Sequence, residues 1–258
     1  MKIVNKLFLL ALVAVLATAC SKDDEPSPDQ QLEQAALAFD QENPPIEIPS
    51  SIASSNSEEA KAINSFMEQV NTLTNHSYYF EVPEGAEKST KPINTNGRTS
   101  ATKENVIVYT WTSSDGQGNS ITVAYQISED DLFYYFEYFM NYNDDGFISV
   151  VKGAESKSDL MEGYLEIFSN ANNDGSSALR YQWKESADGS FTFDYFIFDS
   201  KLSLVVNADG SGTLQSFSGD DNGGYVIEVE YTWNAEGTAG TFTLYDQGEV
   251  STTGDWTS

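Results

Sequence analysis

The sequence has few of the residues on which common catalytic and metal sites depend. Its 258 residues include one cysteine, Cys20, and one histidine, His76. The chain therefore cannot form an internal disulfide or a metal site with several histidines, and a histidine-based hydrolytic triad would have to use His76. That histidine follows a helical pattern in the segment Thr-Asn-His-Ser-Tyr, so we expect it to be an ordinary turn residue.

Basic residues are also scarce, with 13 lysines and arginines against 40 acidic residues. Removal of residues 1–19, which contain Lys2, Lys6 and no acid, leaves 11 basic residues and a net charge near −29. Phosphate backbones and anionic lipid headgroups are both repelled by such a charge. We therefore expect no nucleic-acid partner, and membrane contact only through a lipid.

The familiar catalytic and cofactor motifs are missing as well. The sequence contains no G-x-S-x-G, P-loop, G-x-G-x-x-G or H-E-x-x-H pattern. Carboxylates do occur in pairs, Glu162 with Glu166 and Glu228 with Glu230, and glycosidases use two carboxyl groups across a cleft. Such pairs are expected by chance in so acidic a chain. We expect neither a cofactor nor an enzyme, and a carbohydrate-active enzyme in which Glu137 acts with one pair is an alternative.

The first twenty residues read MKIVNKLFLLALVAVLATAC and have the three-part layout of a secretory signal. Lys2 and Lys6 precede an apolar run over 7–16, and small residues follow at 17–19. The run is too short to cross a bilayer as a helix. Cleavage before Cys20 would leave that residue at the new N-terminus, whereas ordinary signal peptidase could also cut at the A-x-A of residues 17–19.

The segment around Cys20 resembles the lipobox of bacterial lipoproteins, although Ala17 stands where leucine is usual. The following residues, Ser-Lys-Asp-Asp-Glu at 21–25, are similar to the export signal of surface lipoproteins in the Bacteroidota. The resemblance implies a diacylglycerol and a fatty acyl group such as palmitate on Cys20, and an outer-membrane protein exposed at the cell surface. A plain solvated linker is the alternative interpretation of the charged cluster.

Beyond the signal, the pattern predicts a tether and one domain. Residues 20–57 are acidic and rich in proline and serine, which is typical of a tether, with at most a weak helix over 31–40. Within the domain at 58–258, apolar residues recur every three or four positions over 58–73, behind Ser55, Asn56 and Ser57 as candidate caps. This spacing predicts one amphipathic helix.

From about residue 78 to residue 246 the apolar period changes to two, which indicates β-strands with one buried face. Clear examples lie at 106–111, 121–127, 179–184 and 225–233. Asp-Gly or Asn-Gly separates the strands at 115, 145, 174, 188, 209 and 222, and these dipeptides favour tight hairpins. We expect a mainly β fold, an antiparallel meander of about eleven strands that forms a barrel or a strongly curved sheet.

Alternation fails over 132–140, Leu-Phe-Tyr-Tyr-Phe-Glu-Tyr-Phe-Met. A strand covered on both faces explains this run. A Tyr-rich wall of a ligand cavity is the functional alternative, and its candidate ligand-binding residues are Tyr134, Phe136, Glu137, Tyr138 and Met140. Flat aromatic rings suit a sugar or an acyl chain. Trp111, Trp183 and Trp233 alternate with polar residues, so we expect them to pack in the core.

Two acidic turns begin like a calcium-binding EF-hand loop, N-x-N-x-D-G, at residues 141–146 and 170–175. Their twelfth positions are Lys152 and Tyr181, where a bidentate glutamate is required. The third acidic cluster, at 220–222, is equally typical of a polar turn. We interpret all three as turns and expect no metal site.

These observations favour an outer-membrane lipoprotein with a non-catalytic, ligand-binding or structural β domain, whose ligand would be a glycan, a hydrophobic molecule or a protein. The order of one helix and a long meander is loosely similar to half-barrel lipoprotein carriers and lipocalin-like barrels. Carriage of a lipid or another hydrophobic ligand is therefore the alternative, and it needs an apolar cavity of roughly 300 Å³ or more.

Overall fold

The computed structural model describes residues 28–35, 48–73, 77–93, 105–114, 116–158, 161–169, 177–220 and 223–258. Several predicted features lie outside these residues: the signal peptide, Cys20, His76, the turn at 170–175, Asp221 and Asn222.

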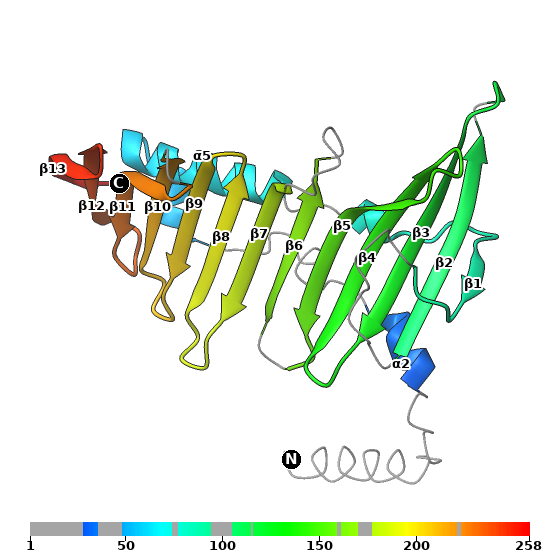
Figure 1. Ribbon diagram of the computed structural model, residues 1–258. Helices are drawn as coiled ribbons and strands as arrows, with labels where there is room; N and C mark the ends of the chain where they lie inside the picture. The colour runs from blue at the N-terminus through cyan, green and yellow to red at the C-terminus, as the bar shows by residue number, and fades with distance from the viewer. Residues whose placement is uncertain are drawn as a thin grey trace, which may run out of the picture.

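The predicted meander is confirmed, and the described residues form thirteen antiparallel strands in one sheet, in the order β1 to β13. The strands are β1 (Glu87–Ser89), β2 (Asn105–Ser114), β3 (Ser120–Glu129), β4 (Phe133–Tyr142), β5 (Phe147–Ser156), β6 (Glu162–Phe168), β7 (Ser177–Glu185), β8 (Phe191–Ile197), β9 (Ser200–Val206), β10 (Gly212–Gly219), β11 (Tyr225–Trp233), β12 (Ala239–Asp246) and β13 (Glu249–Thr257). The sheet does not close, because β1 and β13 lie at opposite ends of it (Figure 1).

Tight turns join neighbouring strands at positions that the sequence predicted. Gly146, Gly189, Gly210 and Gly223 all have positive φ angles, between 78° and 105°. Only glycine adopts such angles without a steric cost, so each of these four glycines allows a turn that ends one strand and reverses the chain. One strand lies beyond the predicted stretch: β13 follows residue 246, and four of its nine residues carry a hydroxyl group.

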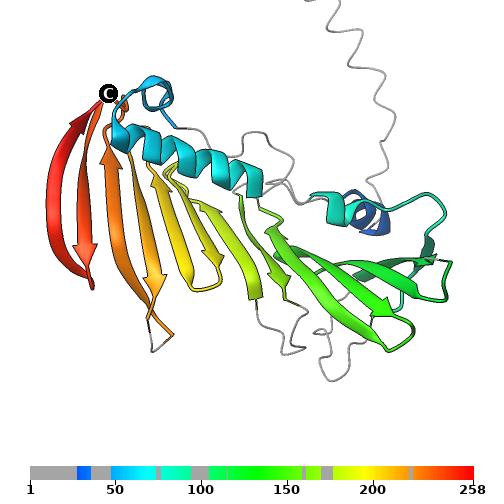
Figure 2. The same ribbon diagram turned by 90° about the horizontal axis from the view of Figure 1, so that it is seen from above.

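Helical segments of the described residues lie on one side of the sheet, namely α2 (Pro28–Gln34), α4 (Ser50–Ser54), α5 (Glu58–Leu73) and the short 3-10 helix η1 (Ser77–Phe80) (Figures 1 and 2). The helix α5 is the predicted amphipathic helix, and it crosses the middle strands (Figure 2). Its N-terminus is capped by Ser57, whose Oγ accepts a hydrogen bond from the Ala60 amide at 3.2 Å. The apolar residues Ile63 and Val70 of α5 are buried against the sheet.

We call the side of the sheet under these helices the helix face and the other side the open face. Because strand residues alternate between faces, every second residue points toward the helices. Large side chains fill the helix face, and those that are fully buried include Phe136, Leu165, Tyr181, Phe193 and Leu204. The predicted core positions of Trp183 and Trp233 are confirmed, since both are buried, and Trp111 packs against the same core.

Cross-strand pairs of a glycine and an aromatic ring recur on the helix face. In each pair a Cβ on the glycine would lie closer than 3.0 Å to the ring. The glycine therefore makes room for the ring, and the ring covers the exposed glycine backbone. The pairs are Gly163 with Trp183, Gly212 with Trp233, Gly240 with Trp256, and Gly254 with Phe242.

Segments that the sequence places in the tether also contact the domain. Leu32 of α2 and Ile52 of α4 are both fully buried in the main core. The helix α4 packs against the turn between β11 and β12. A Cβ on Gly237 in this turn would lie 2.6 Å from Pro49 and 2.9 Å from Ile52. The Ser51 hydroxyl donates to the carbonyl of Glu236 in the same turn. Residues 48–54 are therefore packed against the C-terminal part of the sheet.

Among the residues that the structure describes, no helix combines the length and the apolar character needed to cross a membrane.

Candidate functional site

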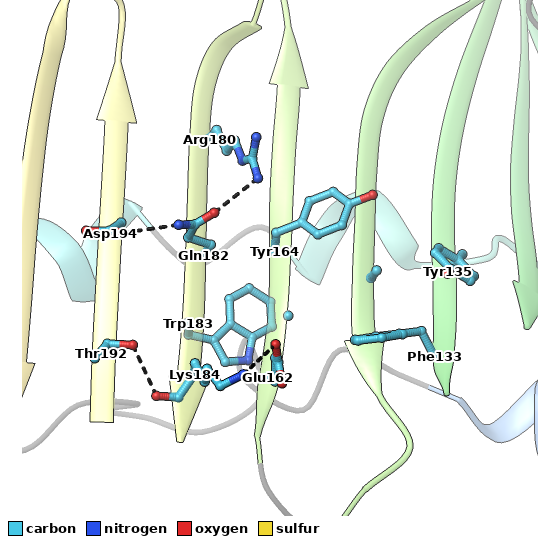
Figure 3. A pocket seen from close by; sticks show the side chains of 12 residues that line it. Phe133, Tyr135, Glu162, Tyr164, Arg180, Gln182, Trp183, Lys184, Thr192 and Asp194 are labelled. Carbon is cyan, nitrogen blue, oxygen red and sulfur yellow. Dashed lines mark hydrogen bonds and ion pairs between the residues drawn. The ribbon is translucent and has the colours of Figure 1, made fainter. Parts of the chain in front are cut away.

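The open face carries a groove of about 380 Å³ over strands β4 to β8 (Figure 3). Aromatic rings line one end of it, and charged and amide side chains line the other. Its lining residues are Phe133, Tyr135, Ala154, Glu162, Gly163, Tyr164, Arg180, Gln182, Trp183, Lys184, Thr192 and Asp194.

Small residues create the floor of the groove. Ala154 lies between Tyr135 and Tyr164 in the cross-strand register, so a methyl group separates two tyrosines. Gly163 on the next strand points to the helix face, where its partner Trp183 lies against it, so only the backbone of Gly163 borders the groove. Since Trp183 is only 2% exposed, its ring closes the floor from the helix face. The depression therefore follows from the small open-face residue Ala154 between two tyrosines.

A chain of polar contacts crosses the groove on β7 and β8. Arg180 Nη2 donates to Gln182 Oε1 at 3.1 Å, and Gln182 Nε2 donates to Asp194 Oδ2 at 3.1 Å. The other carboxylate oxygen of Asp194 contacts Lys201 Nζ at 3.2 Å. Gln182 is therefore held between a cation and an anion, which fixes the orientation of its amide (Figure 3).

A second ion pair lies at the lower edge of the groove in Figure 3. Lys184 Nζ contacts Glu162 Oε1 at 3.0 Å, and both side chains are about half exposed. An exposed pair of this kind contributes little to stability, roughly 0–1 kcal/mol. Its carboxylate and ammonium groups remain within reach of solvent and of a bound molecule.

The aromatic end is also held in place. The rings of Phe133 and Tyr135 pack with centroids 6.3 Å apart, and the Tyr135 hydroxyl donates to Asp130 Oδ2 at 2.6 Å. Burial and this hydrogen bond raise the pKa of Tyr135 to about 12, so the phenol stays neutral. The Arg180 guanidinium lies 5.6 Å from the centre of the Tyr164 ring. Burial raises the pKa of Tyr164 as well.

The cations of strands β2 to β13 lie on the central strands of the sheet. Every lysine and arginine of strands β2 to β13 lies on β5, β7 or β9, namely Lys152, Arg180, Lys184 and Lys201. All four point to the open face in the cross-strand register. In a chain of net charge −27, these central strands therefore carry a local balance of charge.

The five residues predicted to line a ligand cavity are divided between the two faces of β4. Phe136 is fully buried on the helix face, where Phe80 packs against it with centroids 5.8 Å apart. Tyr138 makes an edge contact with Tyr79, and Tyr134 and Met140 pack against the same core. Glu137 points the other way and accepts a hydrogen bond from Gln126 Nε2 at 2.8 Å.

The open-face neighbours of Glu137 explain why alternation fails in β4. Phe139 is buried there with Val108 and Ala124 in a second small core, against which Ile93 packs. The Ile93 amide also donates to Gln126 Oε1 at 2.9 Å. Part of β4 is thus covered on both faces, as the first interpretation of the run predicted, while Phe133 and Tyr135 border the groove.

The first calcium-like turn is a hairpin between β4 and β5, as predicted. Asn141 Oδ1 accepts a hydrogen bond from the Gly146 amide at 2.9 Å, and Asn143 Oδ1 accepts one from Ser120 at 2.8 Å. These oxygens thus bond to the protein backbone. Within the described residues, no three histidine, cysteine, aspartate or glutamate side chains lie close enough to hold a metal ion.

One member of each carboxylate pair predicted from the sequence contacts another side chain. Glu162 borders the groove in its ion pair with Lys184, and Glu166 lies opposite Arg180 and Lys152 in the register. Glu230 lies on β11, three strands beyond the groove, and accepts a hydrogen bond from Gln215 at 2.6 Å.

Most residues of the groove were missed by sequence reasoning, which selected only Glu162 among them. The groove could have been found from the pair of small residues, Ala154 and Gly163, in strands that are otherwise rich in large side chains. That signal becomes meaningful only when the register of β5 and β6 is known.

No protein-family model matches the chain, and no curated protein is significantly similar to it.

Proposed function

We propose that the chain is a lipid-anchored protein of the outer membrane, exposed at the cell surface, whose β domain binds a ligand without altering it chemically. The binding site is the groove on the open face. The observation that carries this proposal is the pre-ordered set of aromatic and polar side chains in the groove, described above.

The N-terminal sequence supports the anchored location. A short apolar run, small residues and Cys20 follow one another, and the cluster at 21–25 comes next. Two or more acyl chains hold a protein stably at a bilayer, whereas one binds only marginally. The strong negative charge of the chain makes any other attachment to anionic lipid unfavourable.

The two faces of the sheet support binding on the open face. The helix face is filled by α5, η1 and large side chains, and Phe136, which a carrier would need in its cavity wall, is fully buried there. The groove has room at the surface and exposes functional groups. A filled core with an accessible groove is what we expect of a surface-binding domain and not of a carrier.

The polar groups of the groove favour binding over catalysis. Glu162 is paired with Lys184 and Asp194 with Lys201, so both carboxylates already have cationic partners. Hydrolysis of a glycosidic bond needs one carboxyl group that donates a proton and a second that acts as a base or nucleophile. In the groove the charged groups instead orient one another, which suits recognition.

The anchor is tested by labelling cells with an alkyne analogue of palmitate. The wild-type chain should incorporate the label and sediment with outer membranes, and Cys20→Ser should do neither. Ala17→Leu, which restores the usual lipobox residue, is the matched control and should remain labelled. Digestion of intact cells with proteinase K should degrade the wild-type chain, because its domain faces outward. Label on Cys20→Ser, or full protection of the wild type, would contradict this part of the proposal.

The binding mode is tested by native mass spectrometry of the chain from Ser21, which lacks the lipid-bearing Cys20, purified gently and then extracted with organic solvent. We expect a mass without a bound hydrophobic molecule, because the helix face is already filled. A stoichiometric co-purifying lipid would favour the carrier instead.

A further inference from the structure

We propose that the ligand of the open-face groove is a neutral carbohydrate chain. This inference rests on the proposed function and names the class of ligand. It follows from three properties of the groove, which are its aromatic end, its ordered polar end and its balanced charge.

The aromatic end offers flat apolar surfaces at the edge of a polar site. Phe133, Tyr135 and Tyr164 come from β4 and β6 and flank the floor at Ala154. Sugar rings have an apolar face of C–H groups, which packs on aromatic rings. Tyr135 is held by Asp130, so this surface exists before a ligand arrives and little side-chain entropy is lost on binding.

The polar end offers donors and acceptors in fixed positions. The contacts from Arg180 through Gln182 to Asp194 use only some of the hydrogen-bonding capacity of these planar groups. A hydroxyl group both donates and accepts, and neighbouring hydroxyls of a sugar match a carboxylate, an amide or a guanidinium. An acyl chain would instead bury the remaining donors and acceptors of these groups without partners, which is costly.

The charge and the length of the groove specify the ligand further. Its lining contains two cations, Arg180 and Lys184, and two anions, Glu162 and Asp194, so the charges cancel. A polyanion would gain nothing there and would be repelled by the acidic chain around it. The lining spans five strands, which at roughly 4.8 Å between neighbours extends about 19 Å. This length favours an oligosaccharide over a single sugar.

A peptide is a poorer match for the same groove. Peptides commonly bind sheets by adding a strand to an edge, where backbone groups are unpaired. The groove lies on the face of central strands, whose backbone groups pair with neighbouring strands. Recognition there depends on side chains alone.

The experiment measures binding of the same chain from Ser21 to dextran, xylan and galactomannan by retardation in native gels that contain the polysaccharide. Polygalacturonate and heparin serve as acidic probes. Phosphatidylcholine vesicles and a tryptic digest of casein represent the other ligand classes. We expect retardation by at least one neutral polysaccharide, and at least about tenfold weaker binding for Tyr164→Ala and for Gln182→Ala.

Gln215→Ala is the matched control, because Gln215 lies in the same open-face row and also donates to a carboxylate, that of Glu230. It should bind like the wild type. Circular dichroism checks that each variant is folded, and Tyr164→Phe should retain binding because it keeps the ring.

The outcomes separate this inference from the proposed function. Binding of vesicles, casein peptides or an acidic polysaccharide that Tyr164→Ala abolishes would overturn the neutral carbohydrate and leave the groove as a binding site. Neutral-polysaccharide binding that both groove variants retain would overturn the groove as well. The absence of binding to any neutral polysaccharide would also overturn the inference.

Discussion

Replacement of Gly163 by alanine tests how the floor of the groove is built. A Cβ at this position would lie 2.5 Å from Cζ2 of Trp183 and against the carbonyl oxygen of Ala154. Neither neighbour can move easily, because one is backbone and the other is a buried ring that packs on Tyr181 at 5.8 Å. Over-packing of this kind costs about 1–3 kcal/mol.

Part of that cost is offset in the unfolded chain. Alanine has less backbone freedom than glycine there, which stabilises the folded state by about 0.4–1 kcal/mol. We therefore expect Gly163→Ala to lower the free energy of unfolding by about 1–2 kcal/mol. With a urea dependence of about 2–3 kcal/mol per molar, the midpoint should fall by roughly 0.5 M. Tryptophan fluorescence during urea unfolding measures this shift.

A double-mutant cycle with Trp183→Phe isolates the contact, because phenylalanine lacks the second ring of tryptophan. If the ring is the obstacle, the double variant should lose less stability than the two single variants together, by about 1 kcal/mol. Additive losses, or a Gly163→Ala variant as stable as the wild type, would refute the view that the glycine is needed to seat Trp183.

Three further predictions concern other parts of the fold. Ile52→Ala should lower the free energy of unfolding by about 2–5 kcal/mol in thermal or urea denaturation, because it leaves a cavity where the fully buried side chain of Ile52 packs. An effect below about 0.5 kcal/mol would show that α4 is not packed against the sheet. Burial raises the pKa of Glu129, but hydrogen bonds from Lys157 and Asn105 and the charge of Lys157 outweigh it and leave the pKa lowered. The carboxylate of Glu129 thus stabilises the fold above the unfolded pKa near 4.5, and this stabilisation is lost as pH falls through the folded pKa. The difference in free energy of unfolding between the wild type and Glu129→Gln should therefore shrink between pH 6 and pH 3. A difference that stays constant over this range would count against the ion pair of Glu129 with Lys157. Phe198→Asn should raise the melting temperature and increase the free energy of unfolding by about 0.5–1 kcal/mol, because Phe198 is 75% exposed and has a φ of 47°, which asparagine adopts more easily. A loss of stability would show that the ring of Phe198 makes a needed contact.

The regular part of the fold could be predicted from the sequence because its signals are local. Alternation over 225–233 matches β11, and the period of three and four residues over 58–73 matches α5. The Asp-Gly and Asn-Gly turns set antiparallel neighbours, so strand order followed as well. The edge strands carry weaker signals. In β1 only three polar residues pair, and in β13 Trp256 is the one buried side chain.

The docking of α4 and the groove could not be predicted, because both depend on contacts between distant residues. Ile52 lies in a short, serine-rich segment, and it is buried only because the turn at Gly237 leaves room for it. The groove combines Ala154, Gly163 and Asp194 from three strands, and alternation within one strand cannot show which residues face each other across strands. The aromatic run over 132–140 did point to β4, but its candidate residues lie mostly on the helix face.

Carboxyl footprinting tests most directly whether the open face binds the ligand. The mature chain would be labelled with a carbodiimide and glycine ethyl ester, with and without the polysaccharide that retards it most strongly, and then mapped by mass spectrometry. We predict that the ligand protects Glu162 and Asp194 and leaves Glu230 unchanged, since Glu230 lies outside the groove on the same face. Equal labelling of all three with and without the ligand, or protection of Glu230 alone, would contradict the account.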